Sequence, residues 1–235
     1  MTETTIPRIE RGTLAEKATG ALLDYIRKQQ MQPGSMLPAE ARLAELLGVS
    51  RPVVREALRG LKGLGVVAVL NGKGAVVREL DSSTLEVYFA HALQTIDNSV
   101  RDMMEVRRGI EGQTAMLAAS RRSDAEATAM KALVRSMREA LDDPVTYSKR
   151  DVQLHVAIAM ASGNALFHHM VHSIQSALED LSLRGMRERR EQKSLLQVQE
   201  LHEQIVDRIV ARDAPGAARA MELHMDVATR VLVAE

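Results

Sequence analysis

Apolar residues recur at helical spacing along most of the chain, and short turn signals separate the periodic segments. Near the N-terminus this pattern predicts three helices, over residues 13–30, 38–48 and 50–65. Thr13 and Glu16 have the spacing of a capping box, which marks the start of the first helix. Gly48 stands where a helix end needs a left-handed residue, and Ser50 can cap the helix that follows. Two helices joined by a short turn with a glycine form the helix-turn-helix pattern.

A β-hairpin is predicted directly after the third helix. Two runs rich in valine, Val66–Leu70 and Ala75–Val77, flank the turn Asn71–Gly74. β-Branched residues on both sides of an Asn-Gly turn are typical of a hairpin. A helix, a helix-turn-helix and a hairpin in this order are a winged helix, so we expect residues 1–78 to form a winged helix-turn-helix domain.

The remaining residues, 79–235, show helical periodicity and no strand pattern. They predict seven helices, over residues 82–95, 100–119, 123–141, 146–161, 166–188, 195–211 and 217–233. Short connections between helices of this length favour an antiparallel bundle. The predicted fold class is therefore mainly α: an N-terminal winged helix-turn-helix with a small β-hairpin, followed by an all-α domain of six or seven helices.

Charge and composition narrow the range of functions. Lys+Arg and Asp+Glu each number 31, but residues 1–78 hold 12 basic and 7 acidic side chains. A basic first domain and an acidic second domain favour a nucleic-acid-binding module joined to another domain. The chain has no cysteine, which excludes disulfides and thiol catalysis and fits a cytoplasmic protein. No apolar run reaches the roughly 18 residues of a membrane span, and no signal peptide is visible.

The third predicted helix carries a basic stripe. Its members recur at spacings of four, four and three residues, which places them on one face: Arg51, Arg55, Arg59 and Lys62. Arginine can pair with phosphate or read guanine in the major groove. A solvated basic face is the alternative, but the helix-turn-helix, the hairpin and the local positive charge favour DNA binding.

Three histidines and one aspartate lie at inward-facing positions of three predicted helices. Asp151 and His155 are four residues apart on one helix, so both project from the same face. His202 and His224 lie on the apolar stripes of two further helices. One carboxylate and three imidazoles suit a divalent metal such as zinc, with positions left open for water or a ligand. Hydrogen-bonded core histidines are the alternative, and the three histidines within residues 168–172 form a rival cluster that we expect to be surface or pocket-lining groups.

Five short segments follow one another between residues 37 and 74: Leu37-Pro-Ala-Glu40, Leu43-Ala44-Glu45, Gly48-Val-Ser-Arg51, Val54-Arg-Glu-Ala-Leu58 and Gly72-Lys-Gly74. In order and spacing they resemble the GntR family of bacterial transcription regulators. The resemblance implies that Arg51 and Arg55 are the main recognition-helix contacts to bases or phosphates. It also implies that Lys73, with Gly72 and Gly74, forms the tip of a wing that enters the minor groove.

The chain departs from the family pattern at one position. Family members often carry Arg directly after the Glu of the first segment, whereas this chain has Ala41 there and Arg42 one residue later. Because a helix turns by about 100° per residue, Arg42 need not reach the same phosphate. The expected DNA-binding set includes Arg42, and Ser50 and Arg59 complete it.

A second set of motifs spans most of residues 85–232: Arg107-x-x-Ile-Glu111, Asp151-x-x-x-His155, Ser162-Gly-Asn164, His202 and His224. They are similar to the FCD effector domain, which defines the FadR subfamily of GntR regulators. In metal-binding members the Asp and three His hold a divalent ion, often zinc, and a small carboxylate effector can complete the coordination. The resemblance therefore implies a divalent metal, zinc first with manganese or nickel as alternatives, held by Asp151, His155, His202 and His224.

Two further residues are candidates for contact with the effector. Arg107 is the expected carboxylate clamp, because a guanidinium fork fits a carboxylate bidentately. A buried ion pair with Glu111, four residues on, is the alternative. Asn164 could contact the effector, but after Gly163 it could equally cap a helix.

These features together predict a bacterial transcription regulator, not an enzyme. A homodimer would place two recognition helices in successive major grooves of a pseudo-palindromic operator. A small organic acid bound near the metal would modulate operator binding, and repression relieved by the effector is the commonest arrangement in the family. A metal-dependent enzyme is one alternative, although it would not need residues 37–74. A regulator whose metal is purely structural is the other.

Overall fold

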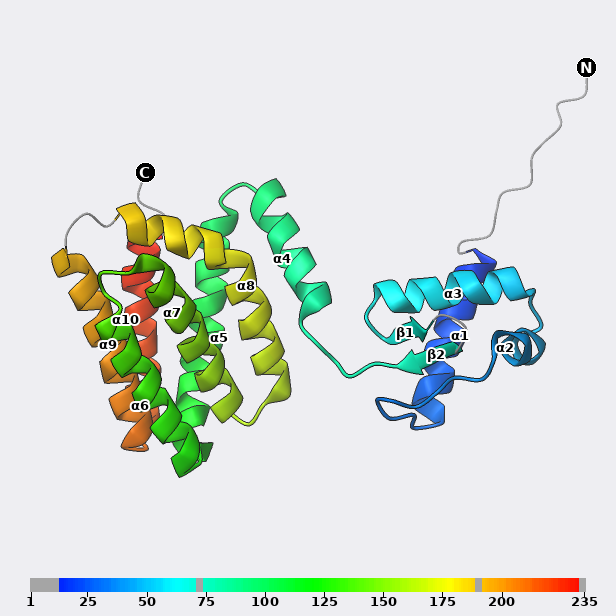
Figure 1. The fold of residues 1–235 in the computed structure, drawn as a ribbon, viewed down its shortest axis with the longest axis horizontal. Helices are drawn as coiled ribbons and strands as arrows, with labels where there is room; N and C mark the ends of the chain where they lie inside the picture. The colour runs from blue at the N-terminus through cyan, green and yellow to red at the C-terminus, as the bar shows by residue number, and fades with distance from the viewer. Residues whose placement is uncertain (1–12, 71–73, 189–191, 233–235) are drawn as a thin grey trace, which may run out of the picture. The chain divides into compact units, whose positions relative to one another are not determined.

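The computed structural model describes residues 13–70, 74–188 and 192–232 and is mainly helical (Figure 1). It divides into two compact units, one ending at Thr84 and the other starting at Leu85. The boundary expected after residue 78 lies six residues before this division. The expected fold class, mainly α with a small hairpin, is confirmed. Among the described helices, none is long and apolar enough to cross a membrane.

The first unit contains the predicted helices and hairpin: α1 (Leu14–Lys28), α2 (Glu40–Leu47), α3 (Arg51–Gly63), β1 (Val67–Leu70) and β2 (Gly74–Val77). The capping box at the start of α1 is confirmed, because the Thr13 hydroxyl accepts from the Glu16 amide at 3.2 Å and the Glu16 carboxylate accepts from the Thr13 amide at 2.6 Å. Gly48 ends α2 in the left-handed conformation, with φ 63°. This conformation costs glycine little and turns the chain toward α3.

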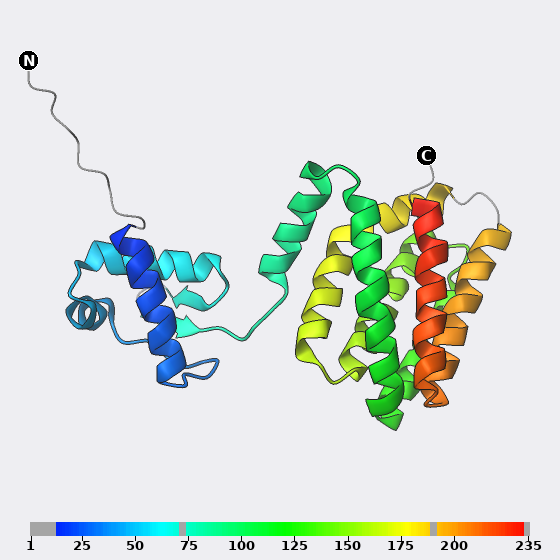
Figure 2. The same ribbon diagram turned by 180° about the vertical axis from the view of Figure 1, so that it is seen from behind.

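In this unit α3 crosses α1 closely, as Figures 1 and 2 show. Gly60 permits the approach, since a Cβ there would lie 3.3 Å from the Thr19 hydroxyl. The hairpin is antiparallel, with Val67 opposite Val77 at one end and Leu70 opposite Gly74 at the other. A small apolar core joins these elements, and its members are buried residues of the helices and the strands: Leu22, Leu37, Leu43, Val54, Leu58, Leu61, Val67 and Val77.

The second unit is helical throughout its described length: α4 (Ser83–Thr95), α5 (Ser99–Arg121), α6 (Asp124–Glu139), α7 (Pro144–Ala161), α8 (Ala165–Glu188), α9 (Gln192–Val210) and α10 (Ala214–Leu232). Each helix lies within a few residues of a predicted one. Ser123 and Glu126 form the second predicted capping box, at the start of α6. The core of this unit is rich in methionine and alanine, which pack closely where helices meet.

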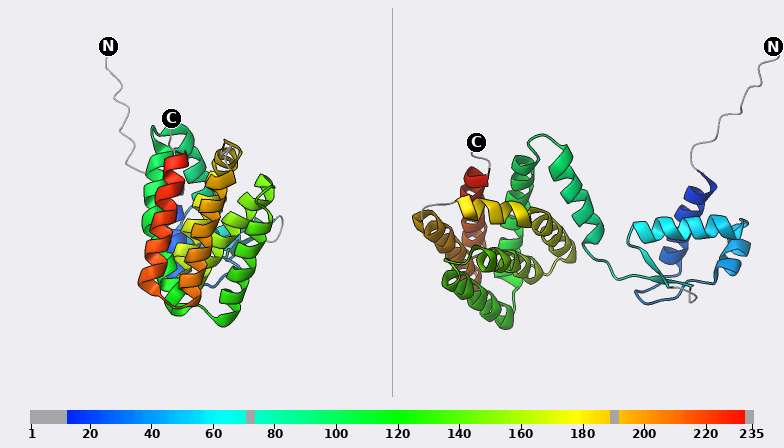
Figure 3. Two further views of the ribbon diagram at one scale, coloured as in Figure 1. Left: turned by 90° about the vertical axis from the view of Figure 1, so that its left-hand side faces the viewer. Right: turned by 45° about the horizontal axis from the view of Figure 1, so that its top comes forward.

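Helix α5 packs against α10, and the two helices run side by side along one face of the second unit (Figures 2 and 3). Small residues allow this contact: a Cβ on Gly112 would lie 3.3 Å from Cγ of Glu222, and Ala115 and Ala118 are fully buried. Helix α5 also packs against α7, α8 and α9. Side chains from α5 therefore reach the interior between these helices.

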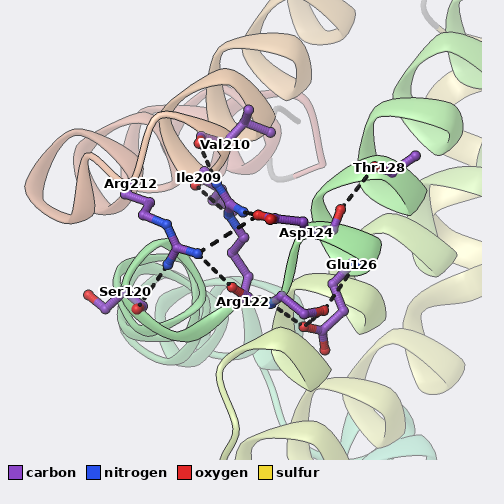
Figure 4. A network of polar contacts seen from close by, with 9 residues as sticks. Ser120, Arg122, Asp124, Glu126, Thr128, Ile209, Val210 and Arg212 are labelled. Carbon is purple, nitrogen blue, oxygen red and sulfur yellow. Dashed lines mark hydrogen bonds and ion pairs between the residues drawn. The ribbon is translucent and has the colours of Figure 1, made fainter.

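Two arginines cap the ends of α5 and α9 reciprocally (Figure 4). Arg122, just after α5, donates to the carbonyls of Ile209 and Val210 at the end of α9, at 3.5 and 2.6 Å. Arg212, just after α9, donates to the carbonyls of Ser120 and Arg122 at 3.4 and 3.2 Å. The last carbonyls of a helix have no partner within it, and a cation there also suits the helix dipole. The contacts fasten these two helices to each other at one end.

Candidate DNA-binding surface and metal centre

Helix α3 separates its apolar and basic side chains cleanly. Its buried face consists of Val54, Ala57, Leu58 and Leu61. Its exposed face carries the predicted stripe of Arg51, Arg55, Arg59 and Lys62. Ser50 occupies the N-cap position with extended backbone, but its side chain makes no capping hydrogen bond, so the expected capping contact was wrong. The Ser50 hydroxyl is therefore not used within the helix.

Several exposed arginines of this unit are paired with carboxylates. Nε of Arg55 lies 2.7 Å from the carboxylate of Glu40 at the start of α2. Arg59 pairs with the neighbouring Glu56 at 3.3 Å. Pairs as exposed as these contribute little to folding, about 0–1 kcal/mol each. Both arginines can therefore exchange a carboxylate for a phosphate or a base edge at small cost.

Arg42 lies on the exposed face of α2 and pairs with Glu45 of the same helix at 3.0 Å. Of the predicted wing, Gly74 is described, and its φ of 91° favours glycine. Gly72 and Lys73 lie outside the described residues, so their predicted role in the minor groove stays a prediction.

In the second unit, Asp151, His155, His202 and His224 come together as expected. They offer one donor atom each, and these atoms lie within 4.8 Å of one another. Helix α7 provides the aspartate and the first histidine, while α9 and α10 provide one histidine each. The three imidazoles are between 0% and 4% exposed.

The imidazoles lie around the Asp151 carboxylate. Nε2 of His202 is 2.9 Å and Nε2 of His155 is 3.8 Å from the same carboxylate oxygen. The ring of His224 lies 4.2 Å from that of His202 and 5.2 Å from that of His155, centroid to centroid. Nδ1 of His224 has no hydrogen-bond partner among the described residues. Buried imidazoles that converge without full hydrogen bonding fit a site built for a metal rather than a satisfied polar core.

The protonation of this group also suits metal binding. Burial, followed by the charges of His202 and His155, holds the pKa of His224 well below that of a free imidazole. Burial alone would raise the pKa of Asp151, but the hydrogen bond from His202 and the nearby imidazoles outweigh it and hold this pKa below its ordinary range. A neutral imidazole and an ionised carboxylate are the states that ligate metals.

Glu111 of α5 orients one of the histidines. It is 2% exposed, and one carboxylate oxygen contacts Nδ1 of His155. The other oxygen accepts from Nε of Arg107 at 2.6 Å. Although burial raises its pKa, the charges of Arg107 and His155 lower it to about 2. An ionised carboxylate at Nδ1 keeps the proton there and leaves Nε2, which faces Asp151, with a lone pair that can ligate a metal.

Tyr147 stands in the same relation to His202, because its hydroxyl lies 3.3 Å from Nδ1 of that ring. Neither Glu111 nor Tyr147 was among the metal-site residues predicted from the sequence. A signal for Glu111 was present, since its position falls on the apolar stripe of α5 with Met104 and Ala115. A buried carboxylate on such a stripe needs a partner, and Arg107 is only one of its two.

The predicted effector residues behave differently. Arg107 is 4% exposed and forms the ion pair with Glu111 that was the alternative interpretation. Its Nη1 also lies 3.7 Å from the Met104 sulfur. Asn164 accepts from the amides of Leu166 and Phe167 at 3.0 and 3.4 Å, so the structure supports the helix-cap interpretation for this residue.

The rival histidine cluster does not converge in the same way. His168 and His172 have ring centroids 6.1 Å apart, and His172 pairs with Glu86 of α4 at 3.1 Å. His172 is 46% exposed. These side chains are surface and partly buried polar groups, as the sequence indicated.

The two halves of the chain match two known domains. The model of the family described as "Bacterial regulatory proteins, gntR family" matches residues 14–77, and the model of the FCD domain matches residues 102–227. The chain belongs to the GntR family of bacterial regulators. It is therefore a transcription regulator with an FCD domain and not an enzyme.

Relatives within the GntR family align over most of the chain. The HTH-type transcriptional regulator LutR of Bacillus subtilis (strain 168) is 31% identical over 206 residues, which cover 85% of this chain and 92% of that protein. The HTH-type transcriptional repressor NanR of Citrobacter rodentium (strain ICC168) is 29% identical over 231 residues, which cover 93% and 85%. The solved structure of Streptococcus agalactiae GntR has a TM-score of 0.69 and 25% identity and covers 92% of this chain and 99% of that one.

Proposed function

We propose that this regulator is a repressor that binds operator DNA as a homodimer through α3 and the hairpin wing, and that a small organic acid bound beside a zinc ion weakens this binding. The name of the NanR relative, a repressor, supports the direction of regulation. The observation that carries the effector half is the group of four buried donor atoms within 4.8 Å in the FCD domain. A divalent ion held by these four residues would accept a carboxylate oxygen if its coordination number rises to five or six.

The residues of the chain would divide the work as follows. The set Asp151, His155, His202 and His224 would hold the ion, and Glu111 would fix the tautomer of His155. Arg107 would pair with the effector carboxylate, since a guanidinium carries five N–H donors and its contacts to Glu111 and Met104 use two. To regulate, the acid must bind one dimer geometry better than the other.

Metal content tests the centre directly. Protein purified without chelator or metal column should contain about one zinc, manganese or nickel ion per chain by elemental analysis. His202→Ala should lose this metal, because it removes a fully buried donor. His172→Ala is the matched control, because this histidine lies outside the group and is 46% exposed. Full occupancy in the His202 variant would refute its role as a ligand.

Exchange of ligand distinguishes a sensor from a structural site. A zinc ion that stays four-coordinate is closed by the four protein ligands and is structural, whereas a sensor must take a further, exchangeable ligand. X-ray absorption of the zinc-loaded protein should therefore show an added oxygen ligand that changes when a small carboxylate binds. An unchanged coordination sphere would favour the structural alternative.

DNA binding is tested at α3. Arg55→Ala should weaken binding to a duplex selected by the wild-type protein from random sequences, and each lost base contact of this kind weakens binding by about 1–3 kcal/mol. Arg27→Ala is the matched control, because Arg27 is also exposed and paired with a carboxylate, but lies at the end of α1. Equal gel-shift affinity for the Arg55 variant and the control would refute the assignment of α3 as the recognition helix.

A further inference from the structure

Helix α8 carries two histidines one turn apart, away from the buried group of donors. His168 and His172 are four residues apart, so their side chains project from the same side of the helix. Their ring centroids lie 6.1 Å apart. Two imidazoles that ligate one ion through nitrogens about 2.0–2.1 Å away have ring centroids roughly 5 Å apart. Because 46% of the His172 side chain is exposed, a small rotation of this ring can bring the pair to that spacing.

A carboxylate from another helix contacts one ring of this pair. Glu86, in the first turn of α4, has a carboxylate oxygen 3.1 Å from Nδ1 of His172. Metal-ligating histidines almost always donate their second ring N–H to such a group, which fixes the tautomer. With the proton held on Nδ1, the lone pair of His172 lies on Nε2 and can ligate a metal. The arrangement repeats that of Glu111 and His155 in the buried group.

The other ring of the pair, His168, is in the state that metals need. Burial, followed by the charges of His169 and His172, lowers the pKa of this imidazole and favours its neutral form. The ring of His169 lies closer to it, with centroids 5.3 Å apart. Adjacent residues of a helix point in directions about 100° apart, however, and do not face each other. The pair one turn apart is therefore the one that can share an ion.

We propose that His168 and His172 form a second metal site, on the surface of α8, for a divalent transition metal, with Glu86 as the outer partner of His172. Two imidazoles suit copper, nickel or zinc, and copper binds most tightly in the general order of affinity. Water completes the coordination. Because two protein ligands replace the four of the buried group, this site holds its ion more weakly. It therefore fills only when metal is added to the purified protein.

The bound ion also strengthens the attachment of α4. This helix has no buried residue, so few contacts hold it to the rest of the second unit, and the contact between Glu86 and His172 joins it to α8. An ion on Nε2 withdraws electron density from the ring and makes the N–H at Nδ1 a stronger donor to Glu86. Segments with few buried contacts open easily. Hydrogen exchange of the α4 amides should therefore slow when metal binds to His172.

The test uses copper(II), whose electron paramagnetic resonance spectrum reports nitrogen ligands. Full-length protein is first loaded with zinc, so that the buried group is occupied, and is then titrated with copper by calorimetry. The wild type should bind about one copper ion per chain through nitrogen and keep its zinc. His168→Gln and His172→Gln should each weaken copper binding at least about tenfold, and Glu86→Gln about tenfold. His91→Gln is the matched control, because His91 is also an exposed histidine but lies on α4, outside the pair.

The outcomes decide the proposal without reference to the buried group, because these substitutions leave its four residues in place. Copper affinities within about twofold of wild type in both His168→Gln and His172→Gln would overturn the proposal. A loss in His169→Gln without a loss in His172→Gln would also overturn it, because the ion would then lie on the adjacent pair. Copper should slow hydrogen exchange in α4 of the wild type but not of Glu86→Gln, and equal slowing in both would refute the role of Glu86.

Discussion

Replacing Glu111 with glutamine tests whether the carboxylate behind His155 contributes to metal affinity. Glutamine keeps the shape of the side chain, but its single amide oxygen can serve either Arg107 or His155, whereas the carboxylate serves both. If the amide nitrogen faces Nδ1 of His155, the proton of the ring moves to Nε2, which is the nitrogen that faces Asp151. Loss of such an outer partner weakens metal binding by about 10- to 100-fold, or about 1.4–2.7 kcal/mol.

The assay is zinc competition against a chromophoric chelator, at a temperature where circular dichroism shows both proteins folded. Glu222→Gln is the matched control, because this carboxylate lies near α5 but contacts Arg108 on the surface, and its zinc affinity should not change. Tyr147→Phe should have a smaller effect than Glu111→Gln, because it removes one neutral contact to His202. A folded Glu111→Gln protein with wild-type zinc affinity would refute the role given to Glu111.

Three further predictions follow from the packing. Arg122→Met should destabilise the second unit by about 3 kcal/mol in urea unfolding, because it removes charged hydrogen bonds to two carbonyls at the end of α9; a loss below about 1 kcal/mol would contradict this. Gly48→Ala should destabilise the first unit by about 1–2 kcal/mol, because φ is 63° there. Gly20→Ala should stabilise the same unit by about 0.5–1 kcal/mol, because Gly20 lies within α1 and nothing is near its added Cβ. Changes in stability of the same sign at both glycines would contradict the role given to the left-handed backbone at Gly48. Arg107→Lys keeps the charge beside Glu111 but removes the fork, so calorimetry should show carboxylate binding weakened about tenfold with zinc affinity less affected; equal losses would count against the clamp.

The helices and their ends could be predicted from the sequence because they depend on neighbours in the chain. The capping boxes at Thr13 and Ser123 need only the residue three positions on, and both are present. The left-handed turn at Gly48 needs only the residue itself. The four candidate metal-site residues could also be predicted, since the spacing of apolar residues along each helix indicates which of its faces is buried.

Contacts between helices were harder to predict, because they depend on how far each helix is displaced along its neighbour. The spacing of Arg107 and Glu111 offered their ion pair only as the alternative to a carboxylate clamp, and nothing local shows that Glu111 also reaches His155, 44 residues away. Gln175 lies on an apolar stripe, but its burial was not predicted from the sequence. A single glutamine among apolar residues can equally belong to a surface position of the helix. Ser50 shows the reverse error, because a residue at the N-cap position need not use its side chain there.

The salt bridge between Arg55 and Glu40 bears on how the protein searches a chromosome. An arginine that already has a carboxylate at 2.7 Å gains little from a random phosphate, because it exchanges one anion for another. Contacts that gain little also displace fewer counterions, so random DNA should hold the protein weakly and with a shallow dependence on salt. An operator sequence that also offers base edges can form contacts with the same arginine that outweigh the lost salt bridge to Glu40. If Arg55 contacts DNA as proposed, the carboxylate of Glu40 would shorten the time spent at wrong sites and leave more of the protein free to find the right one.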